Sequence, residues 1–123
     1  MDYAKLVLVE NVYLFDGSTL DIGILAMLLS DDIGLQRISS FKEFLIDNNY
    51  ANIAGNYTIV EKKSDNVLLA CRFDDDFEPC IQMPQQELLS ILDQWEQLVK
   101  LRPAEITIFK KGDSYILKGC NPH

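Results

Sequence analysis

The sequence predicts an α+β domain in which an antiparallel sheet is backed by helices, in the order β-α-α-β-β-β-α-β-β. Three observations lead to this class. After residue 55, short apolar runs alternate with tight polar turns, as in antiparallel hairpins. One long run before Pro103 repeats its apolar residues at helical spacing. The chain has 123 residues, 48% of them hydrophobic, which suits a single core, so we predict one domain over residues 1–123.

The first element is predicted to be a strand over residues 5–15. This run is rich in Val, Leu and aromatic side chains, and Glu10-Asn11 in its middle is a candidate bulge. The polar residues 16–19 then form a turn and supply candidate N-caps for the helix that follows.

Two helices are predicted next. The run that begins at Leu20 places apolar side chains at helical intervals and predicts a buried helix, despite Gly23. Ser40 and Glu43 have the spacing of a capping box, which predicts a second, short helix ending near residues 47–49.

Three strands are predicted after Gly55. Residues 57–62 and 66–73 flank a short polar connection and read as a hairpin. Residues 79–83 predict a third strand, placed at a sheet edge because Pro79 cannot donate a backbone hydrogen bond.

The clearest helix begins at Pro84 and stops before Pro103. Its apolar stripe predicts a face packed on the core, and Trp95 is expected to pack there rather than anchor an interface. Residues 105–109 and 114–118 predict a final hairpin. The stripe consists of Leu88, Ile91, Leu92, Trp95, Leu98 and Val99.

The charge of the chain restricts its partners. The formal net charge is -8 and the isoelectric point is near 4.4. Direct binding to nucleic acid is disfavoured, because phosphate contacts need clustered Lys and Arg. The same charge would speed association with a basic protein by electrostatic steering. The alternative is that the charge only keeps the protein soluble.

The sequence also predicts where the chain acts. Residues 1–3 lack the basic start of a secretion signal, and the apolar run 20–29 is too short to span a bilayer, so we expect a cytoplasmic protein that does not enter a membrane. Cys71, Cys80 and Cys120 show no metal-type spacing and read as reduced thiols, although a bridge between Cys71 and Cys80 stays open.

The most informative segment is Phe73-Asp74-Asp75-Asp76-Phe77-Glu78, which holds four carboxylates and two aromatic rings. Catalysis would require a base or a nucleophile with a partner, and the only histidine is the last residue, His123. Three consecutive carboxylates also lack the spaced oxygens and the glycine of a calcium loop. We therefore predict no enzyme activity, no cofactor and no metal, and interpret the segment as a solvated turn or a partner surface.

Asp93 and Glu96 are candidate additions to this surface. Asp93 and Glu96 lie off the apolar stripe and would extend an acidic face if the helix end lies near residues 74–78. The Asp31-Asp32 pair ends the first predicted helix, where carboxylates oppose the helix dipole, which indicates either a binding role or a loop.

Residues 57–119 contain a hairpin, then FDDDFEPCIQMPQQELLSILDQWEQLVKLRPAEITIFKKGDSYILKG. This combination of sheet, acidic-aromatic turn, Leu/Trp helix and terminal hairpin resembles small bacterial immunity proteins, particularly those of contact-dependent growth inhibition systems. The resemblance covers about half of the chain and none of the first 55 residues. It implies a cytoplasmic antitoxin that binds the C-terminal domain of a cognate toxin, usually a nuclease, and blocks its active site or substrate surface.

The resemblance assigns no individual binding residue, so the binding residues are predicted from their charge and their position in the sequence. An acidic inhibitor complements a basic nuclease. A type III secretion chaperone, or another acidic inhibitor or interaction protein, is the alternative, and the oligomeric state and the toxin are open. The predicted partner-binding residues are Asp74, Asp75, Asp76, Phe77 and Glu78, with Asp93 and Glu96 secondary.

Overall fold

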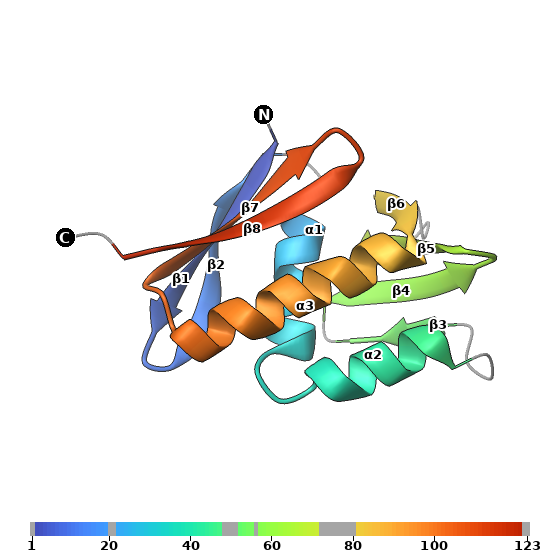
Figure 1. The fold of residues 1–123 in the computed structure, drawn as a ribbon, viewed down its shortest axis with the longest axis horizontal. Helices are drawn as coiled ribbons and strands as arrows, with labels where there is room; N and C mark the ends of the chain where they lie inside the picture. The colour runs from blue at the N-terminus through green and yellow to red at the C-terminus, as the bar shows by residue number, and fades with distance from the viewer. Residues whose placement is uncertain (1, 20–21, 48–51, 56, 72–80, 122–123) are drawn as a thin grey trace.

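The computed structural model describes residues 2–19, 22–47, 52–55, 57–71 and 81–121 (Figure 1). In chain order the elements are β1 (Tyr3–Val9), β2 (Val12–Ser18), α1 (Ile22–Met27), the π-helix η1 (Leu28–Ile33), α2 (Ile38–Ile46), β3 (Asn52–Ala54), β4 (Thr58–Lys63), β5 (Asn66–Cys71), β6 (Ile81–Pro84), α3 (Gln85–Leu101), β7 (Glu105–Lys111) and β8 (Ser114–Cys120).

The strands form two four-stranded sheets with the orders β2-β1-β7-β8 and β3-β4-β5-β6, and every pairing is antiparallel. The first sheet joins the two ends of the chain, because β1 pairs with β7. The second sheet is a meander of successive strands. In Figure 1, α3 runs across both sheets, and α1 also contacts strands of each. The predicted α+β class is confirmed, and the element order broadly follows the prediction, with the strands divided between two sheets.

The predicted first strand is a hairpin. Glu10 and Asn11 have φ values of 51° and 86° and form the turn between β1 and β2. Two consecutive residues with positive φ are typical of tight hairpin turns, for which Asn is well suited and Glu is not. The bulge in this hairpin lies at the Lys5/Leu6 step instead, where the pairing register shifts.

The boundaries of the helices also differ from the prediction. The helix predicted from Leu20 is divided into α1 and the π-helix η1. The N-cap of α2 is Arg37, so Ser40 lies inside the helix and does not cap it. Strand β3, which has three residues, was not predicted, and it pairs with β4.

The apolar stripe of α3 packs as predicted. Leu88, Ile91, Leu92 and Trp95 are fully buried, and Leu98 and Val99 pack against the core from its margin. The Trp95 indole N–H donates to the Gly34 carbonyl at 3.0 Å. Its ring meets Tyr13 edge-on, with 5.7 Å between ring centroids. Trp95 is therefore a core residue with its polar atom satisfied.

Polar side chains of α3 cover the outer edge of β8. The Gln94 side chain donates to the Tyr115 carbonyl at 3.1 Å and accepts from the Leu117 amide at 2.9 Å. Glu87 accepts from the Tyr115 amide at 2.8 Å. These bonds occupy backbone groups that an edge strand would otherwise expose, which fixes α3 against the first sheet.

Candidate functional site

The acidic segment predicted to bind a partner lies outside the described residues. Asp74, Asp75, Asp76, Phe77 and Glu78 fall in the stretch of sequence that connects β5 to β6. Cys80 lies in the same stretch, so the Cys71–Cys80 alternative is likewise outside the described residues. Cys71 and Cys120 are free thiols.

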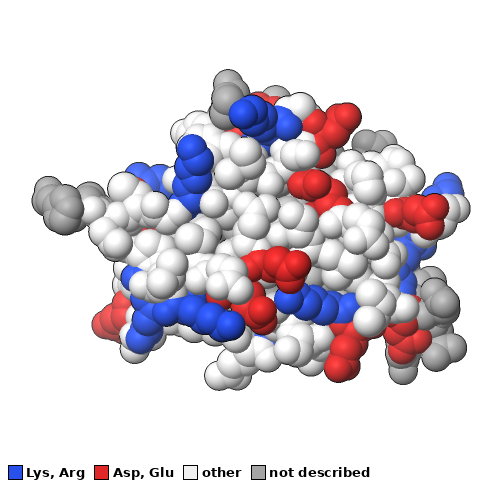
Figure 2. Space-filling view, in the orientation of Figure 1, with Lys and Arg blue, Asp and Glu red and all other residues white. Residues whose placement is uncertain are grey.

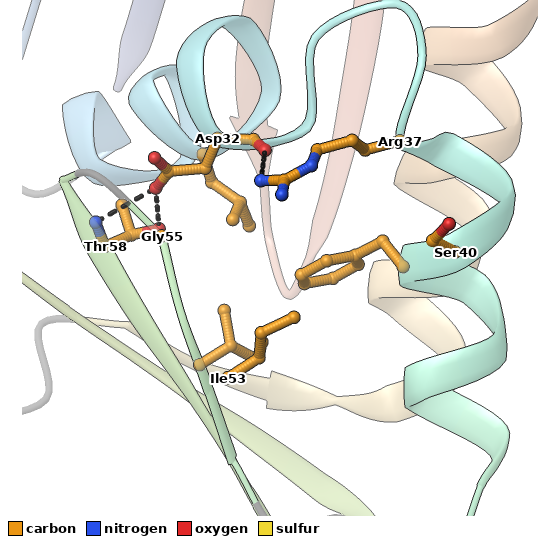
Figure 3. A pocket seen from close by; sticks show the side chains of 9 residues that line it. Asp32, Arg37, Ser40, Ile53, Gly55 and Thr58 are labelled. Carbon is orange, nitrogen blue, oxygen red and sulfur yellow. Dashed lines mark hydrogen bonds between the residues drawn. The ribbon is translucent and has the colours of Figure 1, made fainter.

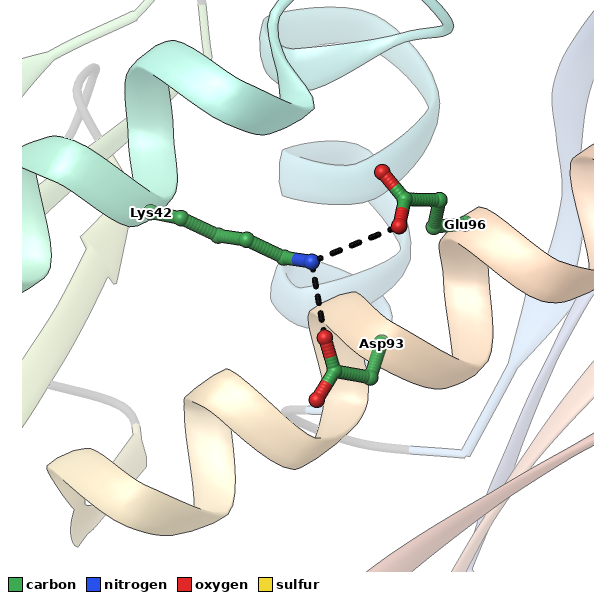
Figure 4. Close-up of polar contacts among 3 residues, drawn as sticks. All are labelled: Lys42, Asp93 and Glu96. Atoms are coloured by element: carbon green, nitrogen blue, oxygen red, sulfur yellow. Dashed lines mark hydrogen bonds and ion pairs between the residues drawn. The ribbon is translucent and has the colours of Figure 1, made fainter.

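Asp93 and Glu96 are brought together on the outer side of α3, where both face Lys42 of α2 (Figure 4). The Lys42 ammonium lies 2.7 Å from Asp93 Oδ1 and 3.5 Å from Glu96 Oε1. The Asp93 side chain is 70% exposed and that of Glu96 is 31% exposed. Hydrogen bonding to Asp93 is the main cause that raises the pKa of Lys42. Lys42 and the two carboxylates therefore form a partly exposed ion-pair cluster whose net charge is one negative unit.

Charge on the face that carries α3 is mixed. Figure 2 shows Asp and Glu side chains interspersed with Lys and Arg across this face, without one continuous acidic patch. A basic partner that contacts Asp93 and Glu96 would have to share them with Lys42. Among the described residues, these two acids are thus suited to a secondary rather than a principal contact.

Asp32 has a different environment, because its carboxylate is buried. One carboxylate oxygen accepts from the Tyr57 amide at 3.2 Å, and the other accepts from the Thr58 amide at 3.0 Å and from the Thr58 hydroxyl. A Cβ atom on Gly55 would lie 2.3–2.6 Å from the Asp32 carboxyl atoms, so only glycine leaves room for the carboxylate there. Asp32 therefore fixes the start of β4 from the end of η1.

This arrangement accounts for the Asp31-Asp32 pair that the sequence placed against the helix dipole. The buried acid is held by donors from a segment about 26 residues further along the chain. Asp31 is exposed, and its pKa is raised by partial desolvation and then by the negative charge of Asp32. Asp32 therefore has a structural role, whereas the charged form of Asp31 is disfavoured by its neighbour.

A cavity of about 360 Å³ lies beside Asp32, between η1, α2, β3 and β4 (Figure 3). The Arg37 side chain extends over it from the start of α2, and its Nη1 donates to the backbone carbonyl of Asp32 at 3.4 Å. No sequence motif indicated this cavity, because its walls come from four elements that meet only in the fold. It is lined by Leu28, Asp32, Arg37, Ser40, Phe41, Ile53, Gly55, Thr58 and Val60.

Further observations concern metals, membranes and relatives. In the described part of the chain, no group of three or more His, Cys, Asp or Glu side chains is arranged to hold a metal ion. None of the described helices combines the length and apolar character needed to cross a membrane. No protein-family model, curated protein or solved structure matches this chain.

Proposed function

We propose that this chain is a cytoplasmic immunity protein that binds and neutralises a cognate bacterial toxin domain through an acidic surface that includes residues 74–78. The observation that carries the proposal is the net charge of -8, combined with a six-residue segment that contains four carboxylates and no catalytic partner. The pattern of residues 57–119, which resembles contact-dependent growth inhibition immunity proteins, supports the same function.

The charge favours a nuclease as the toxin. Nucleases bind phosphates through Lys and Arg, so their substrate surfaces are positive. An acidic inhibitor gains a faster encounter with such a surface and complementary contacts once bound. Asp93 supports a secondary contact, since its side chain is 70% exposed and can meet an incoming cation while it stays near Lys42.

Exposed apolar side chains support a protein as the partner. Several large apolar residues of the β1–β2 hairpin are 39–52% exposed, and exposed apolar side chains can contribute to a protein-binding surface. They are Tyr3, Val9, Val12, Leu14 and Phe15.

The test is co-expression with the C-terminal domain encoded by the neighbouring gene, scored as rescue of growth. We expect the chain to restore growth and to form a one-to-one complex with that domain. The chain with both Asp74→Lys and Asp76→Lys should rescue less well. The matched control carries Asp65→Lys and Asp113→Lys, which make the same change of charge in exposed hairpin turns and should rescue fully.

Three outcomes would contradict the proposal. If the wild-type chain fails to rescue growth or to bind the domain, that toxin domain is not its partner. A constitutive homodimer that binds the N-terminal segment of a secreted effector would indicate a secretion chaperone instead. Turnover of a substrate by the isolated chain would indicate an enzyme.

A further inference from the structure

The cavity between η1, α2, β3 and β4 has the size and lining of a small-molecule site. Its volume of about 360 Å³ lies within the range of about 300–1,000 Å³ that is usual for ligand pockets. Much of its wall is apolar and would receive a hydrophobic body. The apolar wall residues are Leu28, Phe41, Ile53 and Val60.

The acidic group of the cavity, the Asp32 carboxylate, already accepts hydrogen bonds from within the protein. Both Asp32 oxygens accept hydrogen bonds from the start of β4. Figure 3 shows the carboxylate turned toward Thr58 and Gly55, on the side away from the Arg37 guanidinium. A cationic ligand would have to compete with these internal donors, so the cavity does not favour one.

The basic group of the cavity, the Arg37 guanidinium, can donate further hydrogen bonds to a ligand. A guanidinium carries five N–H donors in a planar fork. In the described residues Arg37 makes a single side-chain hydrogen bond, the 3.4 Å contact with the Asp32 carbonyl, and no ion pair. Ser40, one turn further along α2, adds a hydroxyl to the same wall. This donor set fits a carboxylate, which accepts two parallel bonds from an arginine.

The walls are held in place by contacts that need no ligand. The Lys62 ammonium donates to the carbonyls of Phe44 and Asp47, and lies 4.6 Å from the centre of the Phe44 ring. A cation at the C-terminal end of α2 also interacts favourably with the helix dipole. The Trp95 indole fixes the residue after η1 through the Gly34 carbonyl. A cavity with fixed walls loses little entropy when it binds.

We propose that this cavity binds a small organic acid, whose carboxylate pairs with Arg37 and whose apolar body occupies the space lined by Phe41, Ile53 and Val60. The proposal is independent of toxin binding, because none of these residues belongs to the acidic surface. A loss of ligand binding and a loss of growth rescue can therefore be observed separately.

The test is a titration of the isotope-labelled full chain, followed by the backbone amide shifts of the cavity residues. Three probes distinguish the contributions of the carboxylate and of the apolar group. The compound 3-phenylpropionate has both, 3-phenylpropan-1-ol has the apolar group without the carboxylate, and acetate has the carboxylate without the phenyl group. We expect saturable shifts with 3-phenylpropionate at a dissociation constant of about 1 mM or tighter. The alcohol and acetate should each bind at least about tenfold more weakly.

Variants then assign the contacts. Arg37→Gln should weaken 3-phenylpropionate binding about tenfold and leave binding of the alcohol unchanged. Lys63→Gln makes the same change of charge at an exposed position outside the cavity and should have no effect. Ile53→Trp should fill the space and abolish binding of both aromatic probes. The amide spectra report whether each variant is folded.

The proposal is overturned by any of three results: no saturable shift with 3-phenylpropionate, equal affinity for the acid and the alcohol, or equal affinity in the wild type and in folded Arg37→Gln. Shifts confined to residues away from the cavity would also overturn it.

Discussion

Asp32 and Asp93 each join two elements of the fold, but their surroundings differ. Asp32 is 6% exposed and accepts three hydrogen bonds from Tyr57 and Thr58. The Asp93 side chain is 70% exposed and pairs with Lys42 beside Glu96. Burial makes the first carboxylate costly to remove, because its donors would lose their acceptor away from water. Solvent screens the ion pair of the second carboxylate, so Asp93 can be substituted without loss of the fold. The comparison separates acids that build the molecule from acids available to a partner.

The largest effect is expected from Asp32→Ala. This change leaves the Tyr57 and Thr58 amides and the Thr58 hydroxyl without their carboxylate acceptor. We expect the free energy of unfolding to fall by about 3 kcal/mol or more, measured by urea denaturation. Asp31→Ala, one residue earlier and exposed, is the control and should change stability by less than about 0.5 kcal/mol. A loss below about 1 kcal/mol for Asp32→Ala would contradict the structural role of Asp32.

A somewhat smaller effect is expected from Gly55→Ala. The added Cβ would lie within 2.6 Å of the Asp32 carboxyl atoms and displace them, at a cost of about 1–3 kcal/mol. Gly17→Ala is the control, because nothing lies within 4 Å of a Cβ built there. In an Asp32→Ala background, the cost of Gly55→Ala should shrink, since the clash is gone. Strictly additive losses in that double-mutant cycle would show that the two residues act independently.

The partly exposed ion pairs of Lys42 with Asp93 and Glu96 should contribute less to stability. Lys42→Met removes both pairs and should lower the free energy of unfolding by about 0.2–1 kcal/mol at low salt, and by less at 1 M salt. The pKa of Lys42 is raised above its ordinary value of 10.5, mainly by Asp93. Its stabilising contribution is therefore present below pH 10.5 and is lost as pH rises through the higher folded-state pKa. A difference between wild type and Lys42→Met that grew above that pH would contradict this assignment.

The smallest effect on stability is expected when both surface acids are neutralised. Asp93→Asn with Glu96→Gln should change the free energy of unfolding by less than about 0.5 kcal/mol. The same variant should slow association with the toxin domain by a few-fold at low salt, measured by stopped flow, because rim charges act mainly on the encounter rate. If binding is unchanged at low salt while the variant is folded, Asp93 and Glu96 lie outside the interface.

Local patterns predicted the elements that are determined locally. The α3 stripe from Leu88 to Trp95 is buried as its helical spacing required, and the β7–β8 hairpin turns at Gly112, which has a φ of 63°. The N-terminal hairpin was missed because Glu10 is an unusual residue for positive φ. The pairing of β1 with β7 was also missed, since nothing in either strand specifies a partner at the other end of the chain.

The candidate site was less predictable than the fold. Asp31-Asp32 and Asp93 have similar sequence surroundings, each an acid on or beside a helical pattern. Their roles differ because of Thr58 and Lys42, which approach from distant parts of the chain. The cavity beneath Arg37 likewise depends on where α2 meets β3. Contacts of this kind are decided by packing, which periodicity and composition do not encode.

The most direct test of the proposed acidic interface is the association rate constant with the toxin domain, for wild type and for the Asp74→Lys, Asp76→Lys chain, at low and high salt. Electrostatic steering predicts a loss of about tenfold or more at low salt that narrows as salt rises, with the free energy of unfolding unchanged. Equal rate constants for the two folded proteins at low salt would contradict the account.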